Sequence, residues 1–213
     1  MGDFTSTARN ALVDAVVAAL PVAVIYFAGW AYLSSYLGEF SVDATQVEVA
    51  FSTVLVYAFI PLLHWTVILY VLALAALLVG LNSARTATLT SRLLATALAL
   101  AALGLLIVVH QAAKAEARVM AAHVWHGQKS QSIPALDATA QNGPRYGQFQ
   151  QCVARNAVRQ IIGLPDRMFF LCRTAHSPCV HGTMFLIMND GRIVYSADRV
   201  RQGDDDEFKN CSK

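Results

Sequence analysis

Two cysteines and two histidines lie close together in the stretch CRTAHSPCVHG, which begins at Cys172 and ends at Gly182. Thiolate sulfur and imidazole nitrogen are good zinc ligands, and four of them can close a tetrahedral site. The spacing fits neither the C-x2-C nor the H-x3-5-H pattern that zinc sites use. A metal site is therefore the weaker interpretation, and its candidate ligands are Cys172, His176, Cys179 and His181.

A disulfide is the stronger interpretation of the same stretch. We predict a bond between Cys172 and Cys179 at the facing ends of two strands, with a second bond between Cys152 and Cys211. Four cysteines allow three pairings, so the sequence alone does not fix the connectivity. Redox-active thiols are a third alternative, although the C-x-x-C motif of thioredoxin-like enzymes is missing. The choice depends on the side of a membrane on which the stretch lies.

The elements that position these residues follow from the composition. The chain has 213 residues, of which 56% are hydrophobic, and its mean hydropathy is +0.46, which is high for a globular domain. Basic residues are unevenly distributed along the chain, and residues 1–113 contain only three of them, Arg9, Arg85 and Arg92. We therefore predict a membrane domain over 1–113 and a polar domain over 114–213.

Three apolar segments are long enough to cross a membrane as helices, at about 15–34, 52–79 and 93–112. The second segment is longer than the hydrocarbon core is thick, so we expect one helix that tilts or protrudes. Ala97, Ala101 and Gly104 share one face of the third segment, where small residues favour close packing. This face predicts packing within the chain or a homo-oligomer.

Loop charges predict the orientation. The loop between the second and third spans carries Arg85 and Arg92, and the loop between the first and second carries no basic residue. By the positive-inside rule, the N-terminus with Arg9 is cytoplasmic and the C-terminal half is external. Lys114 and Arg118 just beyond the third span count mildly against this.

The cysteines agree with that orientation, because all four follow the last span, where an oxidising compartment favours disulfides. The excess of Arg over Lys and the abundant Ala indicate a bacterial inner-membrane protein with a periplasmic domain. The negligible net charge of +2 argues against a nucleic-acid partner.

The external half is predicted to be a small α+β domain. A helical extension over 114–126 stops at Gly127, a linker covers 127–145, and a β-rich part covers 146–213. Asp190-Gly191 predicts a tight hairpin turn, and the whole is an antiparallel meander of three or four strands. Such a small sheet buries little apolar area, so it needs the disulfides as staples.

His64 is an ionisable residue within the second predicted span, which makes it a candidate functional residue. The alternative is a neutral histidine bonded to a neighbouring helix or to a carbonyl freed by Pro61. A haem held by His64 and His110 fails, because two axial ligands must lie at one level in the membrane. A helix that enters from outside near Phe51 places His64 about 20 Å deep, whereas His110 lies at the outer end of the third span. We expect no cofactor and no metal.

No catalytic constellation is recognisable, so the leading hypothesis is a non-enzymatic membrane protein. Its external domain would bind a partner protein, as an accessory subunit of an envelope complex or as an immunity factor against an exported toxin. The alternative is a membrane enzyme or transporter component with His64 at its centre. The sequence fixes neither the partner, nor the oligomeric state, nor the role of His64.

Overall fold

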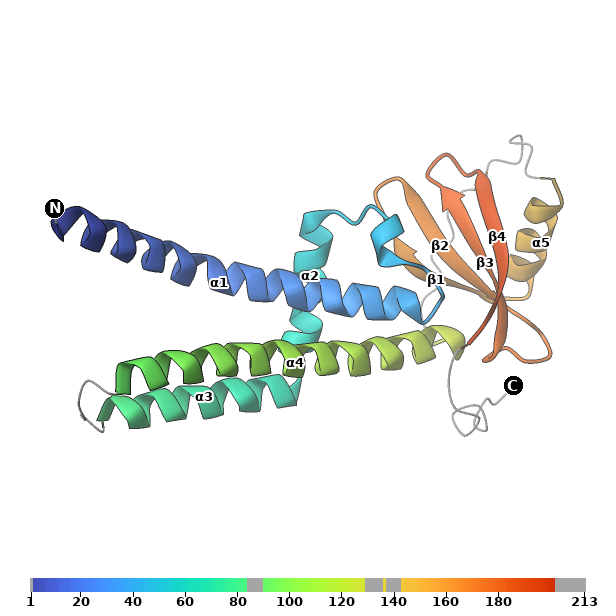
Figure 1. Ribbon diagram of the computed structural model, residues 1–213. Helices are drawn as coiled ribbons and strands as arrows, with labels where there is room; N and C mark the ends of the chain where they lie inside the picture. Colours follow the sequence, from blue (N-terminus) through green and yellow to red (C-terminus); the bar gives the residue numbers. More distant parts are fainter. Residues whose placement is uncertain (1, 84–89, 129–135, 137–142, 202–213) are drawn as a thin grey trace. The chain divides into compact units, whose positions relative to one another are not determined.

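The chain divides into two compact units (Figure 1). The computed structural model describes residues 2–83, 90–128, 136 and 143–201. The helical unit comprises Met1–Ser35 and Phe51–Glu116, and the sheet unit comprises Tyr36–Ala50 and Ala117–Lys213. The segment that follows the first predicted span thus belongs with the sheet and not with the helices.

Two long apolar helices contribute most of the helical unit. Within α1 (Gly2–Gly38) the segment Ala18–Gly38 is long and apolar enough to cross a membrane, and within α4 (Thr90–Trp125) the segment Thr96–Trp125 is as well. The first and third predicted spans overlap these segments. The length and apolar composition of both segments are compatible with membrane spans.

The second predicted span is broken into two helices, α2 (Phe51–Leu62) and α3 (Trp65–Ser83), which are bent by 78°. The prediction of one long tilted helix over 52–79 is therefore wrong. Pro61 lies in the last turn of α2, where a proline removes an amide donor from the helical ladder. Among the described residues, two helices are apolar enough to span a membrane, or three spans are present if the bent pair counts as one.

The helices of the helical unit share an apolar cluster beside the bend. Ala58 of α2, Val67 of α3 and Val109 of α4 are buried together with Ala28 of α1. Farther along, the Tyr70 hydroxyl of α3 donates to the Ala101 carbonyl of α4 at 2.8 Å. Since later residues of α3 contact earlier residues of α4, the two helices run antiparallel, as Figure 1 shows.

The sheet unit contains a four-stranded antiparallel sheet in the order β1-β2-β3-β4, which confirms the predicted meander. Its strands are β1 (Val158–Gly163), β2 (Arg167–Arg173), β3 (His181–Met188) and β4 (Ile193–Val200). The turn between β3 and β4 is the predicted one. Gly191 has a φ of +83°, a region that glycine enters without a steric penalty, and its amide donates to the Met188 carbonyl at 2.9 Å.

Helix α5 (Gly143–Ala154) covers one face of this sheet (Figure 1). Phe149 of α5 is fully buried between Phe170 of β2 and Phe185 of β3, with edge-to-face ring contacts at 5.9 and 5.2 Å. Helix α5 is not predicted, because the sequence pattern assigns 127–145 to a linker and 146–213 to a β-rich part, and Gly143-Pro144 is typical of a loop. A proline in the first helical turn costs nothing, since the amides there have no helical partner.

The opposite face of the sheet is covered by the end of α4 and by the segment after α1. Trp125 is fully buried, stacks on Phe40 at 6.1 Å, and lies against Gly182 of β3. The Tyr36 hydroxyl donates to the Ile161 carbonyl of β1 at 2.9 Å. The middle of the sheet, in β2 and β3, is therefore buried on both faces, whereas most of β4 is exposed or half-buried. The core of the sheet unit does not depend on disulfides alone.

Candidate functional site

Cys152 and Cys172 form a disulfide, with their Cα atoms 5.9 Å apart. The bond joins α5 to β2 and lies in the apolar core between helix and sheet. The predicted pairings Cys172–Cys179 and Cys152–Cys211 are therefore wrong, because each uses a cysteine of this bond. The physical reason is the face of β2 from which Cys172 projects, which is the face that α5 covers.

Cys179 is buried in the turn between β2 and β3 and is also disulfide-bonded. The turn is closed by its own backbone, since the Thr174 amide donates to the His181 carbonyl at 3.0 Å and the Val180 amide to the Ser177 carbonyl at 3.1 Å. Cys211 lies outside the described residues. The cysteines of the opening stretch are thus staples, as predicted, although the predicted partners differ.

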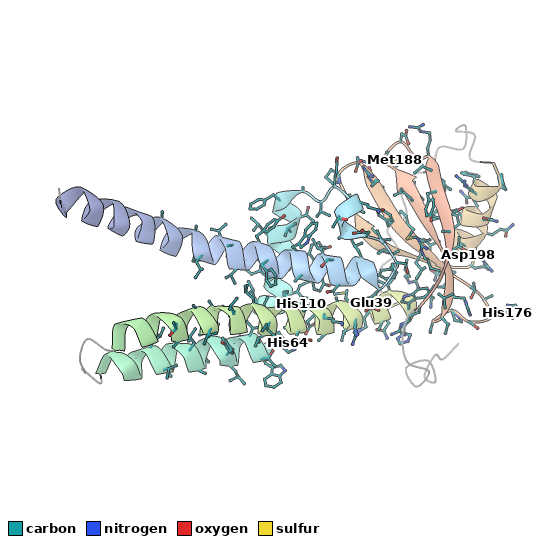
Figure 2. The ribbon with its side chains drawn as sticks, in the orientation of Figure 1. Glu39, His64, His110, His176, Met188 and Asp198 are labelled. Atoms are coloured by element: carbon teal, nitrogen blue, oxygen red, sulfur yellow. A yellow bond between two sulfur atoms is a disulfide. The ribbon has the colours of Figure 1, made fainter. Side chains whose placement is uncertain are left out.

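The histidines of that stretch do not gather with the cysteines. His176 and His181 are both exposed, and Figure 2 shows His176 on the loop that leaves the sheet. Among the described residues, no group of three or more His, Cys, Asp or Glu side chains is placed to hold a metal ion. Sulfurs that share a disulfide are not thiolates, so Cys172 and Cys179 offer no zinc ligands in this state.

His64 lies at the break between α2 and α3 (Figure 2). Its imidazole Nδ1 accepts a hydrogen bond from the Thr66 amide at 3.3 Å and lies 2.7 Å from the Thr66 hydroxyl oxygen. Because an N-cap side chain accepts from one of the first free amides of a helix, His64 is the N-cap of α3. Its imidazole satisfies the Thr66 amide, which has no helical partner at the start of α3.

The other imidazole nitrogen of His64 faces α4. Nε2 lies 3.9 Å from the Glu116 carboxylate, while His110 of the same helix is exposed. The expected depth of about 20 Å assumed a straight helix. The bend instead places His64 beside a charged residue that follows the third predicted span. Pro61 marks a kink in the apolar run, but the sequence does not predict a bend as large as 78° and therefore does not bring His64 and Glu116 together.

Tyr70 of α3 occupies the small-residue face of α4. Its hydroxyl donates to the Ala101 carbonyl, and a Cβ built on Gly104 would meet that hydroxyl at 2.5 Å. The intramolecular alternative therefore accounts for Ala101 and Gly104. The predicted homo-oligomer through Ala97, Ala101 and Gly104 stays a prediction.

Three arginines that are scattered in the sequence meet beside the end of α4. Arg155 follows α5, Arg159 belongs to β1, and Arg173 ends β2. The antiparallel register sets Val158 opposite Cys172, and the Arg173 amide donates to the Ala157 carbonyl at 3.1 Å. This pairing of β1 with β2 brings the three side chains to one corner of the sheet unit.

Two of these arginines cap α4. Gly127 has a φ of +77°, and the Gln128 amide donates to the His123 carbonyl at 2.9 Å, as in a Schellman motif. Arg159 Nε donates to the Gly127 carbonyl at 2.8 Å, and an Arg173 guanidinium nitrogen donates to the Trp125 carbonyl at 3.2 Å. Positive charge is favourable here, because a helix C-terminus carries a partial negative charge.

Beside this cap lies a pocket of about 320 Å³, which we call the arginine pocket. Burial lowers the pKa of Arg173, and the positive charge of Arg159 lowers it further. Arg173 Nε is buried with no hydrogen-bond partner within the described ranges. In the same ranges, no carboxylate pairs with Arg155, Arg159 or Arg173. The pocket is lined by Arg155, Ala157, Arg173, Thr174, Ala175 and Pro178.

The arrangement suits an anion. Guanidinium groups present donors in a planar fork that matches a carboxylate, and charge-assisted hydrogen bonds are the stronger ones. The sequence does not predict this site, because residues 155, 159 and 173 form no cluster along the chain. No protein-family model matches the chain, and comparison with curated proteins and with solved structures finds no match either.

Proposed function

We propose that the protein is a membrane-anchored binding protein whose sheet unit engages a partner through the arginine pocket. The observation that carries this proposal is the set of neighbouring guanidinium groups without a carboxylate partner in the described part of the chain. A partner with an acidic surface segment would supply the missing charge. Arginine is common at the centre of such interfaces.

The proposed topology has three crossings, with α1, α3 and α4 each crossing once. The sheet unit contains both the segment after α1 and the chain after α4, so both must lie on the same side of the membrane. With α1 and α4 crossing, α3 must cross as well. Its 19 residues extend about 28 Å, close to the thickness of the hydrocarbon core.

Loop charges and disulfides support placing the sheet unit outside, which for a bacterial inner membrane is the periplasm. Arg118 counted against this orientation from the sequence alone. In the sheet unit its guanidinium lies 3.6 Å from the Glu39 carboxylate, so part of that charge is balanced locally.

Binding, and not catalysis, is the activity that the pocket favours. Its lining offers fixed positive charge, one hydroxyl and apolar surface, which suit recognition. An accessory subunit of an envelope complex and an immunity factor against an exported toxin both fit this description. The identity of the bound partner distinguishes the two.

Site-specific photo-crosslinking tests the proposal. A photoreactive residue at Ala175, in the pocket lining, should give a discrete adduct in intact cells. Arg155→Glu should abolish the adduct while protein abundance stays unchanged. The matched control is the same probe at Gln148, which is exposed on α5. An adduct that survives Arg155→Glu, or that forms equally from Gln148, would contradict the proposal.

A second candidate function uses the bend, and the approach of His64 to Glu116 favours it. A titratable pair next to a helix break suits proton movement or gating in a membrane enzyme or transporter component. His64→Asn separates this role from capping, because asparagine is a good N-cap but does not titrate. If His64→Asn abolishes a cellular phenotype without lowering abundance, the bend is functional; if only His64→Ala acts, His64 is a cap.

A further inference from the structure

We propose that α2 is an interfacial helix, which lies along the outer surface of the membrane with one apolar face in the lipid. The proposal rests on the three-crossing topology of the proposed function, and it adds the place of α2, which that topology leaves without a crossing. The partner of this face is the bilayer itself, at the level where headgroups meet acyl chains.

The chain connections place both ends of α2 at the outer boundary of the membrane. Phe51 directly follows Ala50, the last residue of the segment that belongs with the sheet unit. At the other end, α3 begins at Trp65, and its 19 residues extend about 28 Å, nearly the whole thickness of the hydrocarbon core. In the proposed topology Trp65 therefore lies at the outer boundary, and α2 has no depth left to descend.

The bend turns α2 away from the direction of the spans. Helices α2 and α3 are bent by 78°, and Figure 1 shows α2 running across the direction of α3. The 12 residues of α2 extend about 18 Å, which is too short to cross the hydrocarbon core. With α3 along the membrane normal, this angle makes α2 descend by only about 4 Å over its whole length.

One face of α2 is covered by the neighbouring helices. Val54 and Ala58 are fully buried, and Ala58 shares its apolar cluster with Ala28 of α1 and Val109 of α4. A Cβ built on Gly29 of α1 would collide with the Val54 carbonyl oxygen, so the two backbones touch where the helices cross. These contacts hold α2 at one level along α1 and α4.

The opposite face of α2 is apolar and exposed. Val56, Phe59 and Leu63 are 67%, 61% and 70% exposed, and spacings of three and four residues place them on one face. Leu63 continues the last turn, because its amide donates to the Phe59 carbonyl at 3.0 Å. No charged residue occurs between Phe51 and Leu63. A helix that is apolar all round needs cover on every side, and protein covers only one side of α2.

The surroundings favour lipid as the cover of the exposed face. Exposed apolar side chains follow on α3, including Ile68 and Leu72, which face the bilayer in the proposed topology. Tyr26 and Trp30 of α1 stack at 6.5 Å, and Tyr26 also stacks on Phe51 at 5.4 Å. Tryptophan and tyrosine are enriched at the boundary between lipid and water. A specific interface with a second copy uses about 20–30 residues on each side, more than this face of α2 offers.

Depth measurements by electron paramagnetic resonance test the inference on the full-length protein in vesicles of phosphatidylethanolamine and phosphatidylglycerol. A nitroxide amino acid is incorporated during translation, so that the cysteines stay unmodified. Collisions with oxygen, which dissolves in lipid, and with a water-soluble nickel complex give the depth of each label. The labelled positions share the exposed face of α2 and are Ser52, Val56, Phe59 and Leu63.

An interfacial helix and a descending helix give different depth profiles. Ser52 and Leu63 are 11 residues apart, which is about 16 Å along the helix axis. We expect all four labels at a shallow depth in the lipid, with a difference of about 3 Å between the ends. A gradient that approaches 16 Å, or four labels in water, would overturn the inference. So would labels that are shielded from both reagents and broadened by spin–spin interaction, because a second copy would then cover the face.

Two control positions calibrate the profile. Leu72 is exposed on α3, seven residues beyond Trp65, so its label should lie about 10 Å deeper than the start of α3. Gln46 is exposed in the segment before α2, and its label should report water.

The controls also separate this inference from the proposed function. If the Leu72 label is deep but the α2 labels descend or lie in water, the topology stands and the inference fails. If the Leu72 label lies in water, the crossing by α3 and the inference fail together. The crosslink from Ala175 reports the arginine pocket and does not depend on either result.

Discussion

The two polar clusters of this molecule differ in how their charges are satisfied. At the bend, His64 bonds to Thr66 of its own helix and faces Glu116 of the next, so its groups find partners within the helical unit. In the sheet unit, the guanidinium groups of Arg159 and Arg173 bond to backbone carbonyls, and Arg155 bonds to one carbonyl and one sulfur. The polar groups at the bend are accounted for by the fold, because they have partners within the helical unit. The guanidinium groups have no carboxylate partner among the described residues, so they indicate a site for an anionic ligand.

The largest predicted effect comes from removing the buried ring that packs α5 against the sheet. Phe149→Ala should lower the free energy of unfolding of the sheet unit by about 3–5 kcal/mol, because it removes a fully buried ring between helix and sheet. Chemical denaturation followed by circular dichroism measures this. The exposed neighbour Gln148→Ala should change stability by less than about 0.5 kcal/mol. Equal effects would mean that α5 does not hold the sheet unit together.

The second largest effect is expected from removing the disulfide between Cys152 and Cys172. Replacing both Cys152 and Cys172 by Ala should cost about 2–4 kcal/mol, the usual contribution of a native disulfide. Peptide mapping without reductant should recover these two cysteines in one linked pair. Recovery of a Cys172–Cys179 pair would contradict the structure and restore the pairing that the sequence favoured.

A smaller effect sharpens the assignment of His64 as a cap. His64→Ala should destabilise the helical unit by about 0.5–2 kcal/mol, and His64→Asn should restore most of that loss, because both His64 and asparagine supply an acceptor for the Thr66 amide. Thermal unfolding in detergent measures the difference. If Asn and Ala are equally destabilising while Glu116→Gln matches them, the contact with Glu116 matters more than the cap.

The smallest effect is a pH dependence in the segment after α1. Hydrogen bonds from the Thr45 amide and hydroxyl lower the pKa of Asp43, which caps the short helix η1 (Ala44–Gln46). A carboxyl with a lowered folded-state pKa stabilises the fold above its unfolded pKa and loses that contribution as the pH falls through the folded value. Asp43→Asn should therefore reduce the acid sensitivity of the sheet unit slightly. An unchanged acid limb of the stability curve would contradict this role.

Local patterns predicted much of this fold, and long-range geometry could not be predicted. The apolar runs and the Asp190-Gly191 turn are encoded by neighbouring residues, and the structure contains both. Helix α5 was missed because Gly143 and Pro144 suit a loop and a first helical turn equally well. The face from which Cys172 projects depends on what covers the sheet, which spacing alone does not reveal.

For the candidate sites too, local patterns were predicted and long-range contacts were not. His64 was recognised because an ionisable residue stands out in an apolar run, but its partner Glu116 depends on the bend. The arginine pocket was not predicted, because Arg155 and Arg173 come together only through the pairing of β1 with β2. Charge clusters created by strand register leave no mark in the sequence.

Peptide binding in solution tests the central claim, that the arginine pocket binds carboxylates, most directly. The probe is a fluorescent carboxylate-rich peptide, GDDDEF, added to full-length protein in detergent. Fluorescence anisotropy should report saturable binding that weakens with salt and is lost in Arg155→Glu. An amide version of the peptide, GNNNQF, should not bind. Equal binding of both peptides, or binding that survives Arg155→Glu, would contradict the account.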